Sequence, residues 1–235
     1  MIKYIFDVDG TLTPSRQRID SKFGTWFEDF CSHNNVYLVT GSDREKTLEQ
    51  VGCNIYNLAK RVYNCSGNDV WIGMLNVKSS DYKIPETAIA FLRQCLDESQ
   101  WPVRTGNHIE ARPGMINFSI LGRNASLGER RGYVYHDKKH SERKTIADAF
   151  NSMFPYLHAT IGGETGLDIG PIGFNKSKIL EDFSDNDEIY FFGDATFKGG
   201  NDYEIYTEVN KKNNGTSFTV QRWEETWKIL RELKA

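Results

Sequence analysis

The sequence predicts an α/β core that is interrupted by a smaller α+β insert. Short apolar strands alternate with amphipathic helices near both ends of the chain, which is typical of a parallel α/β sheet. In between, strand pairs joined by tight turns accompany two helices, as in an antiparallel α+β unit. We therefore expect a first core part at residues 1–77, an insert, here called the cap, at residues 78–174, and a second core part at residues 175–235.

Composition excludes several classes of protein. The chain has 235 residues, of which 39% are hydrophobic and 26% charged, as expected for a globular protein with a buried core. A net charge of −3 argues against a nucleic-acid or anionic-membrane partner. No apolar run approaches the roughly 20 residues of a membrane span, and the chain enters a strand at once, so we expect no signal peptide. Four widely spaced cysteines without a CxxC motif predict free thiols in a cytoplasmic protein.

The first core part contains strands and helices in alternation. Residues 2–5 form an apolar run that predicts a buried first strand. A helix should follow Ser21, its expected N-cap, because large apolar side chains then recur at the helical period. Further strands are expected at residues 36–39 and 61–65, with a helix at residues 44–51 that Gly52 ends.

The cap pattern is less regular. Pro85 should open a helix, and Pro113-Gly114 should join two strands in a tight turn. Tyr133-Val134-Tyr135 is rich in strand-forming residues and predicts another strand. Ser141 can cap a second helix. Two short strands, at residues 160–161 and 167–169, complete the cap. In the second core part we expect a helix at 176–183, strands at 188–192 and 217–221, and a closing helix at 223–233.

The stretch Asp7-Val8-Asp9-Gly10-Thr11 carries the strongest chemical signal. Residues two apart at the end of a strand point to the same side, so the two carboxylates should lie together. Carboxylate oxygens suit Mg²⁺, which usually binds one or two of them together with a substrate phosphate. The alternatives are an acidic turn or a calcium loop, but Gly10 follows too soon for an EF-hand. One carboxylate could attack phosphorus while the other handles a proton.

Three further positions fit phosphoryl transfer. Thr40 ends a strand before a helix, where hydroxyl and amide groups can bind phosphate, although Ser42 or Asp43 could simply cap that helix. Lys176 precedes a late strand; a lone lysine there is usually solvated, but it could also offset the charge of a phosphoryl group. Asp194 follows the apolar strand Phe191-Phe192-Gly193. In this order the four motifs resemble the haloacid dehalogenase (HAD) superfamily of phosphotransferases, which implies a HAD-type Rossmann-like core.

A longer resemblance covers nearly the whole chain. The segments FDVDGTLTP-x-R-Q, ARPGMINFSILGRN, IGGETGLDI and FGDATFKGGNDYEIY resemble the eukaryotic-type phosphomannomutase family. That family has a HAD core, an antiparallel α+β cap and commonly a dimer joined through the caps. The resemblance implies interconversion of mannose 6-phosphate and mannose 1-phosphate with Mg²⁺ and a hexose 1,6-bisphosphate activator.

The resemblance also implies roles for individual residues. Asp7 would be the nucleophile, and Asp9 the general acid/base that also lends a backbone carbonyl to the metal, while Asp194 would complete the metal site. Arg16 would contact substrate from the core, and Asp168 would contact sugar hydroxyls from the cap. The implied cap residues that hold the distal phosphate are the arginines Arg112, Arg123 and Arg130.

Some positions depart from the family pattern. Gly166 stands where the family has a serine that contacts substrate, and Thr40 belongs to a Thr-Gly-Ser-Asp segment where the family has Gly-Gly-Ser-Asp. His108 aligns with the phenylalanine that forms the family's dimer. A second metal loop would fall near Tyr206 and Glu208, where the match is poor.

We therefore expect a phosphomannomutase-like enzyme that acts on a small phosphosugar and forms a homodimer through the cap. The alternative is a HAD sugar-phosphate phosphatase, in which water attacks the aspartyl phosphate; Gly166 and Thr40 favour this reading, whereas the cap arginines favour the mutase. A third reading, a non-catalytic binding module, would require a core motif to be missing. His136 and His140, four residues apart, are interpreted as solvated rather than as metal ligands.

Overall fold

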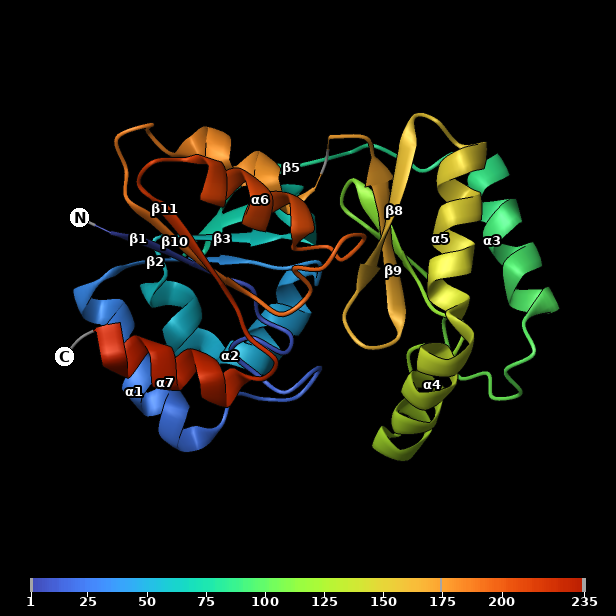
Figure 1. Ribbon diagram of the computed structural model, residues 1–235, viewed down its shortest axis with the longest axis horizontal. Coiled ribbons are helices and arrows are strands. Elements are labelled where there is room, and N and C mark those ends of the chain that lie inside the picture. The colour runs from blue at the N-terminus through green and yellow to red at the C-terminus, as the bar shows by residue number, and fades with distance from the viewer. Residues whose placement is uncertain (1, 174, 234–235) are drawn as a thin grey trace.

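Two lobes lie side by side, and both the first strand and the last helix belong to the larger one (Figure 1). The structure is a computed structural model that describes residues 2–173 and 175–233. The larger lobe, the core, comes from both ends of the described chain, and the smaller lobe, the cap, comes from the middle.

A seven-stranded sheet forms the centre of the core, in the order β11-β10-β1-β2-β3-β4-β5. The first five of these strands run parallel, and the last two are added antiparallel at one edge. Parallel strands place their carboxyl ends along one edge of the sheet, where α/β proteins bind ligands. The strands are β1 (Lys3–Phe6), β2 (Asn35–Val39), β3 (Arg61–Asn64), β4 (Asp69–Ile72), β5 (Leu75–Ser79), β10 (Ile189–Gly193) and β11 (Gly215–Thr219).

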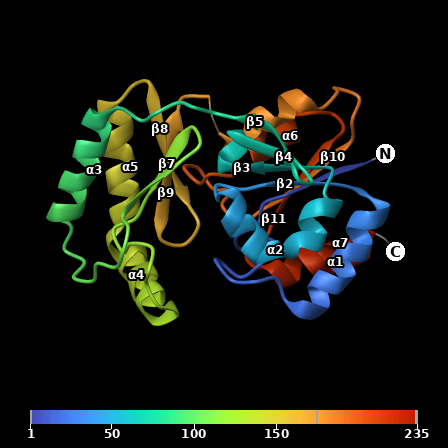
Figure 2. The same cartoon turned by 180° about the vertical axis from the view of Figure 1, so that it is seen from behind.

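Helices cover both faces of this sheet, as Figures 1 and 2 show. Tyr4 and Phe6 pack on one face and Ile5 on the other, because side chains alternate along a strand. The first face is covered by α1 (Ser21–His33), α2 (Arg44–Leu58) and α7 (Trp223–Leu233). The second is covered by the 3-10 helix η2 (Lys176–Asp182) and by α6 (Tyr203–Lys211), while a short 3-10 turn, η1 (Cys65–Gly67), follows β3.

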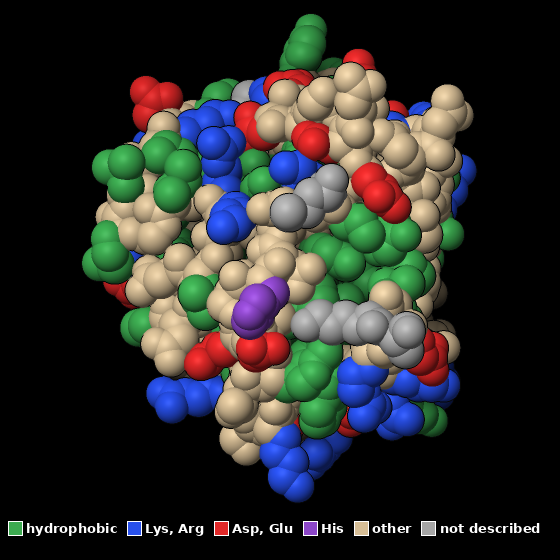
Figure 3. Space-filling model, turned by 90° about the vertical axis from the view of Figure 1, so that its left-hand side faces the viewer, with side chains coloured by type: hydrophobic (Ala, Val, Ile, Leu, Met, Phe, Trp, Pro, Cys, Tyr) green, Lys and Arg blue, Asp and Glu red, His purple; other side chains and the backbone are tan. Residues whose placement is uncertain are grey.

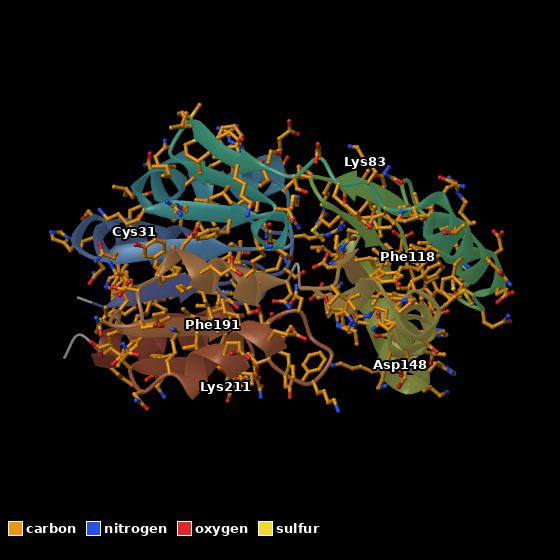
Figure 4. All side chains as sticks on the ribbon, turned by 90° about the horizontal axis from the view of Figure 1, so that it is seen from above. Cys31, Lys83, Phe118, Asp148, Phe191 and Lys211 are labelled. Carbon is orange, nitrogen blue, oxygen red and sulfur yellow. The ribbon has the colours of Figure 1, made fainter. Side chains whose placement is uncertain are left out.

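The cap is a four-stranded antiparallel sheet with helices on the side away from the core. Its order is β6-β7-β9-β8, and its own apolar cluster lies between the sheet and the helices. Phe118 lies in this cluster and Phe191 in the core, so each lobe has a separate hydrophobic interior (Figure 4). The elements are α3 (Glu86–Glu98), β6 (Ile109–Arg112), β7 (Met115–Phe118), α4 (Leu127–His140), α5 (Glu142–Met153), β8 (Leu157–Gly162) and β9 (Gly166–Pro171).

The predicted fold class is confirmed, but five elements differ from expectation. The strand predicted at Tyr133-Val134-Tyr135 lies inside α4, because Ser126 and Glu129 form a capping box that starts a helix ahead of it. The helix predicted to end before Gly52 continues to Leu58, with a kink where Gly52 has a φ of +80°. The hairpin β4–β5 and helix α6, which contains Tyr206 and Glu208, were not predicted.

Smaller differences concern caps and boundaries. Asp20, not Ser21, caps α1, since its carboxylate accepts from the amides of Lys22 and Phe23. Ser141 precedes α5 in a left-handed conformation, but its side chain makes no capping hydrogen bond. Strand β5 ends at Ser79, so residues 78 and 79 of the predicted cap pair within the core sheet. The second predicted boundary, at residue 174, lies outside the described residues.

The histidine pair is only partly as predicted. His140 is exposed, as expected, but His136 is mostly buried, with its side chain 18% exposed, and it packs against Trp101. Its Nε2 lies 3.8 Å from a carboxylate oxygen of Glu142. The two histidine rings lie 4.4 Å apart, between their centroids. The interpretation of His136 as solvated was therefore wrong.

The surface of the core away from the cap carries charges of both signs. Figure 3 shows Lys and Arg side chains scattered among Asp, Glu and apolar side chains on this face. Among the described residues, no helix has both the length and the apolar character needed to cross a lipid bilayer.

Candidate active site

The loop after β1 places Asp7 at the carboxyl edge of the core sheet. Asp7 is buried, and the hydroxyl of Thr11 donates to its Oδ2 over 3.3 Å. Gly10 has a φ of +81°, and a Cβ on it would lie 2.4 Å from Oδ2 of Asp194. Only glycine therefore permits this turn and the close approach of the two loops.

Lys176 lies beneath Asp7 and is almost fully buried. Its Nζ lies 2.5 Å from Oδ1 of Asp7 and 2.8 Å from Oδ1 of Asp202. Burial alone would lower the pKa of Lys176, but Asp202 and Asp7 together raise that pKa above its ordinary value. The lysine thus stays charged beside the predicted nucleophile.

Three carboxylates converge next to this lysine. One oxygen from each of Asp7, Asp194 and Asp202 lies within 4.8 Å of the others, the one such cluster of three potential ligands among the described residues. Burial, with the charges of Asp202 and Asp9 added, raises the pKa of Asp7 to about 7, although Lys176 opposes this. Burial and the charge of Asp7 likewise raise the pKa of Asp194. A divalent cation would relieve this repulsion, and oxygen-only ligands suit Mg²⁺.

Asp202 was not among the predicted site residues. It is buried, accepts from the backbone amide of Ala195 over 3.1 Å, and holds Lys176. The segment Gly199-Gly200-Asn201-Asp202 was visible in the sequence, yet a second acidic residue eight positions after Asp194 did not itself indicate proximity. The turn between the two aspartates brings them together.

Asp9 lies near Asp7, but its carboxylate belongs to a different network. Oδ1 accepts from the backbone amide of Arg16 over 2.7 Å and from Nε2 of Gln50 over 3.0 Å, while Oδ2 accepts from the hydroxyl of Ser42 over 3.4 Å. Burial raises the pKa of Asp9, against the hydrogen bond from Gln50. The carboxylate is therefore held away from the acidic cluster; whether its backbone carbonyl contacts a metal stays a prediction. Gln50 was not predicted, because a glutamine inside a helix carries no sequence signal.

Thr40 directly follows β2, beside this network. Its hydroxyl accepts from the backbone amide of Ser42 over 3.1 Å, and its backbone carbonyl accepts from the amide of Ser66. Asp43 caps α2 by accepting from the amide of Lys46, so the predicted cap is present, while phosphate binding at Thr40 stays a prediction.

The three predicted cap arginines face the core. Arg112 on β6 and Arg123 both contact Glu110, and Arg112 also donates to the backbone carbonyl of Gly41 across the lobes. Arg130 on α4 contacts Glu164 over 3.1 Å and Ser15 of the core over 3.4 Å. The Nε atoms of Arg112 and Arg130 are buried and have no hydrogen-bond partner among the residues that the structure describes. Unpaired buried donors are costly, so this cleft is prepared for an acceptor.

Asp168 joins the cap to the core. Its Oδ1 accepts from Nδ2 of Asn117 over 2.7 Å, and its Oδ2 accepts from Nδ2 of Asn201 over 3.1 Å. A Cβ on Gly41 of the core or on Gly162 of the cap would lie 2.4 Å from Oδ2 of Asp168. Gly166, on the same strand, leaves the space beside Asn117 without a side chain.

All the predicted catalytic and substrate residues except Lys176 line one cleft between the lobes, with an empty volume of about 490 Å³. Lys176 does not line the cleft itself, but its Nζ contacts Asp7, which does. Tyr206 and Glu208 lie on α6, where Glu208 pairs with Lys211, and neither lines the cleft. The cleft is lined by Asp7, Asp9, Ser15, Arg16, Thr40, Gly41, Ser42, Arg112, Asn117, Arg123, Arg130, Gly162, Gly163, Glu164, Thr165, Gly166, Asp168, Asp194 and Asn201.

Known proteins resemble both the sequence and the fold. The family model of the eukaryotic phosphomannomutases matches residues 25–235. The chain belongs to the eukaryotic phosphomannomutase family. A phosphomannomutase of Saccharomyces cerevisiae is 36% identical, over 97% of this chain and 92% of its own length. One from Dendrobium officinale is 38% identical, over 86% of this chain and 83% of its own.

Solved structures of other HAD-type proteins share the fold at low identity. A haloacid dehalogenase-like hydrolase from Bacteroides thetaiotaomicron has a TM-score of 0.58 at 12% identity and is covered over its full length. A truncated IMP-nucleotidase of Plasmodium falciparum has a TM-score of 0.63 at 15% identity, over 99% of this chain and 70% of its own. These structures confirm the HAD-type core with its inserted cap.

Proposed function

We propose that this protein is a phosphomannomutase that interconverts mannose 6-phosphate and mannose 1-phosphate through a phosphorylated Asp7. One observation carries the proposal: the cleft has the acidic cluster of Asp7 and Asp194 on its core side and unpaired arginine donors on its cap side. A mutase must hold a phosphate at each end of the same sugar. The names of the relatives support the choice of mannose phosphates.

In the proposed reaction, phosphorylated Asp7 donates its phosphoryl group to the free hydroxyl of a hexose monophosphate. Asp9 accepts the proton of that hydroxyl as the new P–O bond forms and the bond from phosphorus to Asp7 breaks. The hexose bisphosphate then reorients in the cleft. Its other phosphoryl group is transferred to Asp7, and Asp9 returns the proton to the sugar oxygen from which that group departs. A hexose 1,6-bisphosphate activator would phosphorylate Asp7 at the start.

The surroundings of the two aspartates suit these different roles. Asp7 is fixed by Lys176 and Thr11, so its carboxylate is oriented and its charge partly offset. Asp9 lies outside the acidic cluster, and burial raises its pKa, so it can carry a proton during turnover. Asp7, Asp194 and Asp202 would hold Mg²⁺, which supplies charge stabilisation for the transferring phosphoryl group.

The cap arginines would grip the distal phosphate. A guanidinium group binds phosphate oxygens bidentately, which fixes both position and orientation. In the structure Arg112 and Arg123 share Glu110, and Arg130 is paired with Glu164. A phosphate in the cleft would take up the unpaired Nε atoms of Arg112 and Arg130, and Arg16 would approach it from the core side.

A sugar-phosphate phosphatase is the second candidate. The observation that favours it is Gly166, which offers no side chain to a sugar at the centre of the cleft. A sugar held less firmly would leave room for water to attack phosphorylated Asp7.

Phosphorus NMR separates the two. The protein is incubated with Mg²⁺ and mannose 1-phosphate, with and without glucose 1,6-bisphosphate. A mutase converts the substrate into mannose 6-phosphate in the presence of the activator, whereas rapid release of free phosphate would reject the mutase in favour of the phosphatase. The Asp7→Asn variant serves as control and should lose roughly 10⁴-fold or more in rate; retained activity would show that Asp7 is not the nucleophile.

Two further expectations remain predictions. The first is the homodimer through the cap. His108 stands where the family has its dimer-forming phenylalanine, and Nδ1 of His108 lies 2.9 Å from the backbone carbonyl oxygen of Ser119. Light scattering would distinguish a 27.0 kDa monomer from a dimer. The cytoplasmic location is the other, and a fluorescent fusion in the source cell would test it.

A further inference from the structure

Asn117 presents an unused hydrogen-bond acceptor at the substrate cleft. It lies on β7 directly opposite Asp168 of β9, on the face of the cap sheet that is turned to the core. Its Nδ2 donates to Asp168 over 2.7 Å, and only 6% of the residue is exposed. Its Oδ1 is buried and has no hydrogen-bond partner within residues 2–173 and 175–233.

The neighbours of Asn117 determine which way its amide points. The carboxylate of Asp168 accepts from Asn117 at one oxygen and from Asn201 at the other. A carboxylate that accepts from the amide must meet the amide nitrogen, so the carbonyl oxygen of Asn117 points elsewhere. Turning the amide by half a rotation would place two oxygens against each other.

Among the described residues, no group donates a hydrogen bond to that oxygen. A Cβ on Gly166 would lie 2.9 Å from Nδ2 and 3.1 Å from Oδ1 of Asn117, so position 166 adjoins both ends of this amide and a longer side chain there could have donated to Oδ1. Glycine has no such side chain. Buried carbonyl oxygens are nearly always paired, and an unpaired one that lines a binding cleft indicates a donor that arrives with the ligand.

We propose that Oδ1 of Asn117 accepts a hydrogen bond from a ring hydroxyl of the phosphohexose and thereby helps to select the sugar. The inference rests on the proposed function. The donor must be a hydroxyl and not a phosphate, because a phosphate oxygen would repel the amide oxygen. Asn117 thus binds a sugar hydroxyl between the two phosphate-binding ends of the cleft, where Gly166 contributes no side chain.

The test is a comparison of dissociation constants by calorimetry. Mannose 1-phosphate and its 2-, 3- and 4-deoxy analogues are titrated, with Mg²⁺ present, into protein that carries Asp7→Asn to prevent turnover. Removing the hydroxyl that Asn117 reads should weaken binding about three- to tenfold, the effect of one neutral hydrogen bond. We call this loss of affinity, relative to mannose 1-phosphate, the penalty for the missing hydroxyl. In the double variant that also carries Asn117→Ala, this one penalty should disappear, while the penalties for the other two hydroxyls remain.

Asn201→Ala is the matched control, because Asn201 also donates to Asp168 and lines the cleft. It should weaken all four ligands alike and leave every penalty in place. Asn117→Asp offers a second check, since it keeps an acceptor oxygen and should keep the penalty even if overall affinity falls. Thermal unfolding of each variant confirms that it folds.

The outcomes separate the two proposals. Unchanged penalties in the Asn117→Ala protein would overturn the role of Asn117 and leave the proposed function standing. A protein that binds neither mannose 1-phosphate nor any analogue would overturn both. Loss of all three penalties together would show that Asn117 only supports Asp168, which also contradicts the proposal.

Discussion

Asp194 shows how a residue of the proposed active site can oppose stability. It shares a buried site with Asp7 and Asp202, and the three carboxylates face a single lysine. Burial and these like charges raise its pKa, so in the metal-free protein the ionised form of Asp194 weakens the fold. The same repulsion is what makes the site attractive to a divalent cation.

We predict that Asp194→Asn stabilises the metal-free protein and abolishes the stabilisation by Mg²⁺. The neutral amide removes one charge from the cluster. If the free energy of unfolding rises by ~1 kcal/mol, the midpoint of thermal unfolding should rise by about 2–4 °C in a protein of this size. Differential scanning calorimetry at pH 8, with and without Mg²⁺, measures both effects. The control is Asp185→Asn, whose side chain is 99% exposed. A variant that still responds fully to Mg²⁺ would contradict the metal assignment.

The arginines of α4 allow a comparison between neighbours. Arg130 is buried in the cleft, whereas the next residue, Arg131, is exposed. Arg130→Lys keeps the charge but loses the planar fork, so we expect KM for mannose 1-phosphate to rise about tenfold. Arg131→Lys should leave KM unchanged. Equal effects of the two substitutions in steady-state kinetics would show that only general charge matters at this end of the cleft.

At the residue scale the sequence predicted the groups that belong to linear motifs. Asp7, Asp9, Lys176 and Asp194 were found because each follows a recognisable strand or precedes one. Gln50 and Asn117 were missed, because their importance comes from what lies opposite them across a sheet or between helices. Such proximity depends on register and packing, which a single sequence does not show.

At the scale of elements, the loop between β10 and α6 connects the acidic cluster to the cap. Asp194 and Asp202 stand at its two ends. Between them, the carbonyl of Gly199 accepts from the amide of Ile161 over 2.8 Å, and the amide of Asn201 donates to the carbonyl of Ile161 over 3.0 Å. Because β8 is the edge strand of the cap sheet, the loop pairs with an edge that is otherwise open.

Binding of Mg²⁺ at the acidic cluster should therefore slow hydrogen exchange in the cap strand β8. Fixing both ends of the loop should strengthen its pairing with β8, so we expect slower hydrogen exchange at the amide of Ile161 when Mg²⁺ is added. The amide of Phe118, inside the cap sheet, should exchange at the same rate in both states. Hydrogen exchange followed by mass spectrometry or NMR measures the difference, and equal slowing at both amides would point to general stabilisation of the cap instead.

The elements that sequence reasoning predicted wrongly have identifiable causes. Tyr133, Val134 and Tyr135 favour strands, but the capping box at Ser126 and the burial of Tyr133 against the cap interior favour a helix. The hairpin β4–β5 was missed because every residue of β5 is exposed, so it lacks the apolar alternation of a half-buried strand. Long elements with one apolar face, such as α1 and α7, were predicted correctly.

At the scale of the whole molecule, the lobes meet through polar contacts. The links are the pairs Arg112 with Gly41, Arg130 with Ser15, Asp168 with Asn201, and Ile161 with the loop after β10. Each apolar cluster stays within one lobe. Separating the lobes would expose little apolar surface, so the free energy that keeps them together is small, and domain movement is expected.

We expect the molecule to become more compact when the cleft is filled. A closed chain of 235 residues should have a radius of gyration of about 17–18 Å. Small-angle X-ray scattering should give a larger value for the free protein and a fall when Mg²⁺ and mannose 1-phosphate are added to the Asp7→Asn variant. Asp168→Ala, which removes a link between the lobes, should reduce that fall. A radius that is the same with and without ligand would contradict a moving cap.

The carboxylate of Asp168 fits between two glycines, Gly41 in the core and Gly162 in the cap, and this has a genetic consequence. The two positions are 121 residues apart in the sequence, yet a methyl group at either would meet the same oxygen atom. Alanine at Gly41 or at Gly162 should therefore be deleterious for a shared reason. Asp168→Ala should suppress the loss of thermal stability caused by each, so that a mutational scan of pairs would reveal strong positive epistasis among these three sites. Additive effects in the double variants would show that the glycines are required for separate reasons.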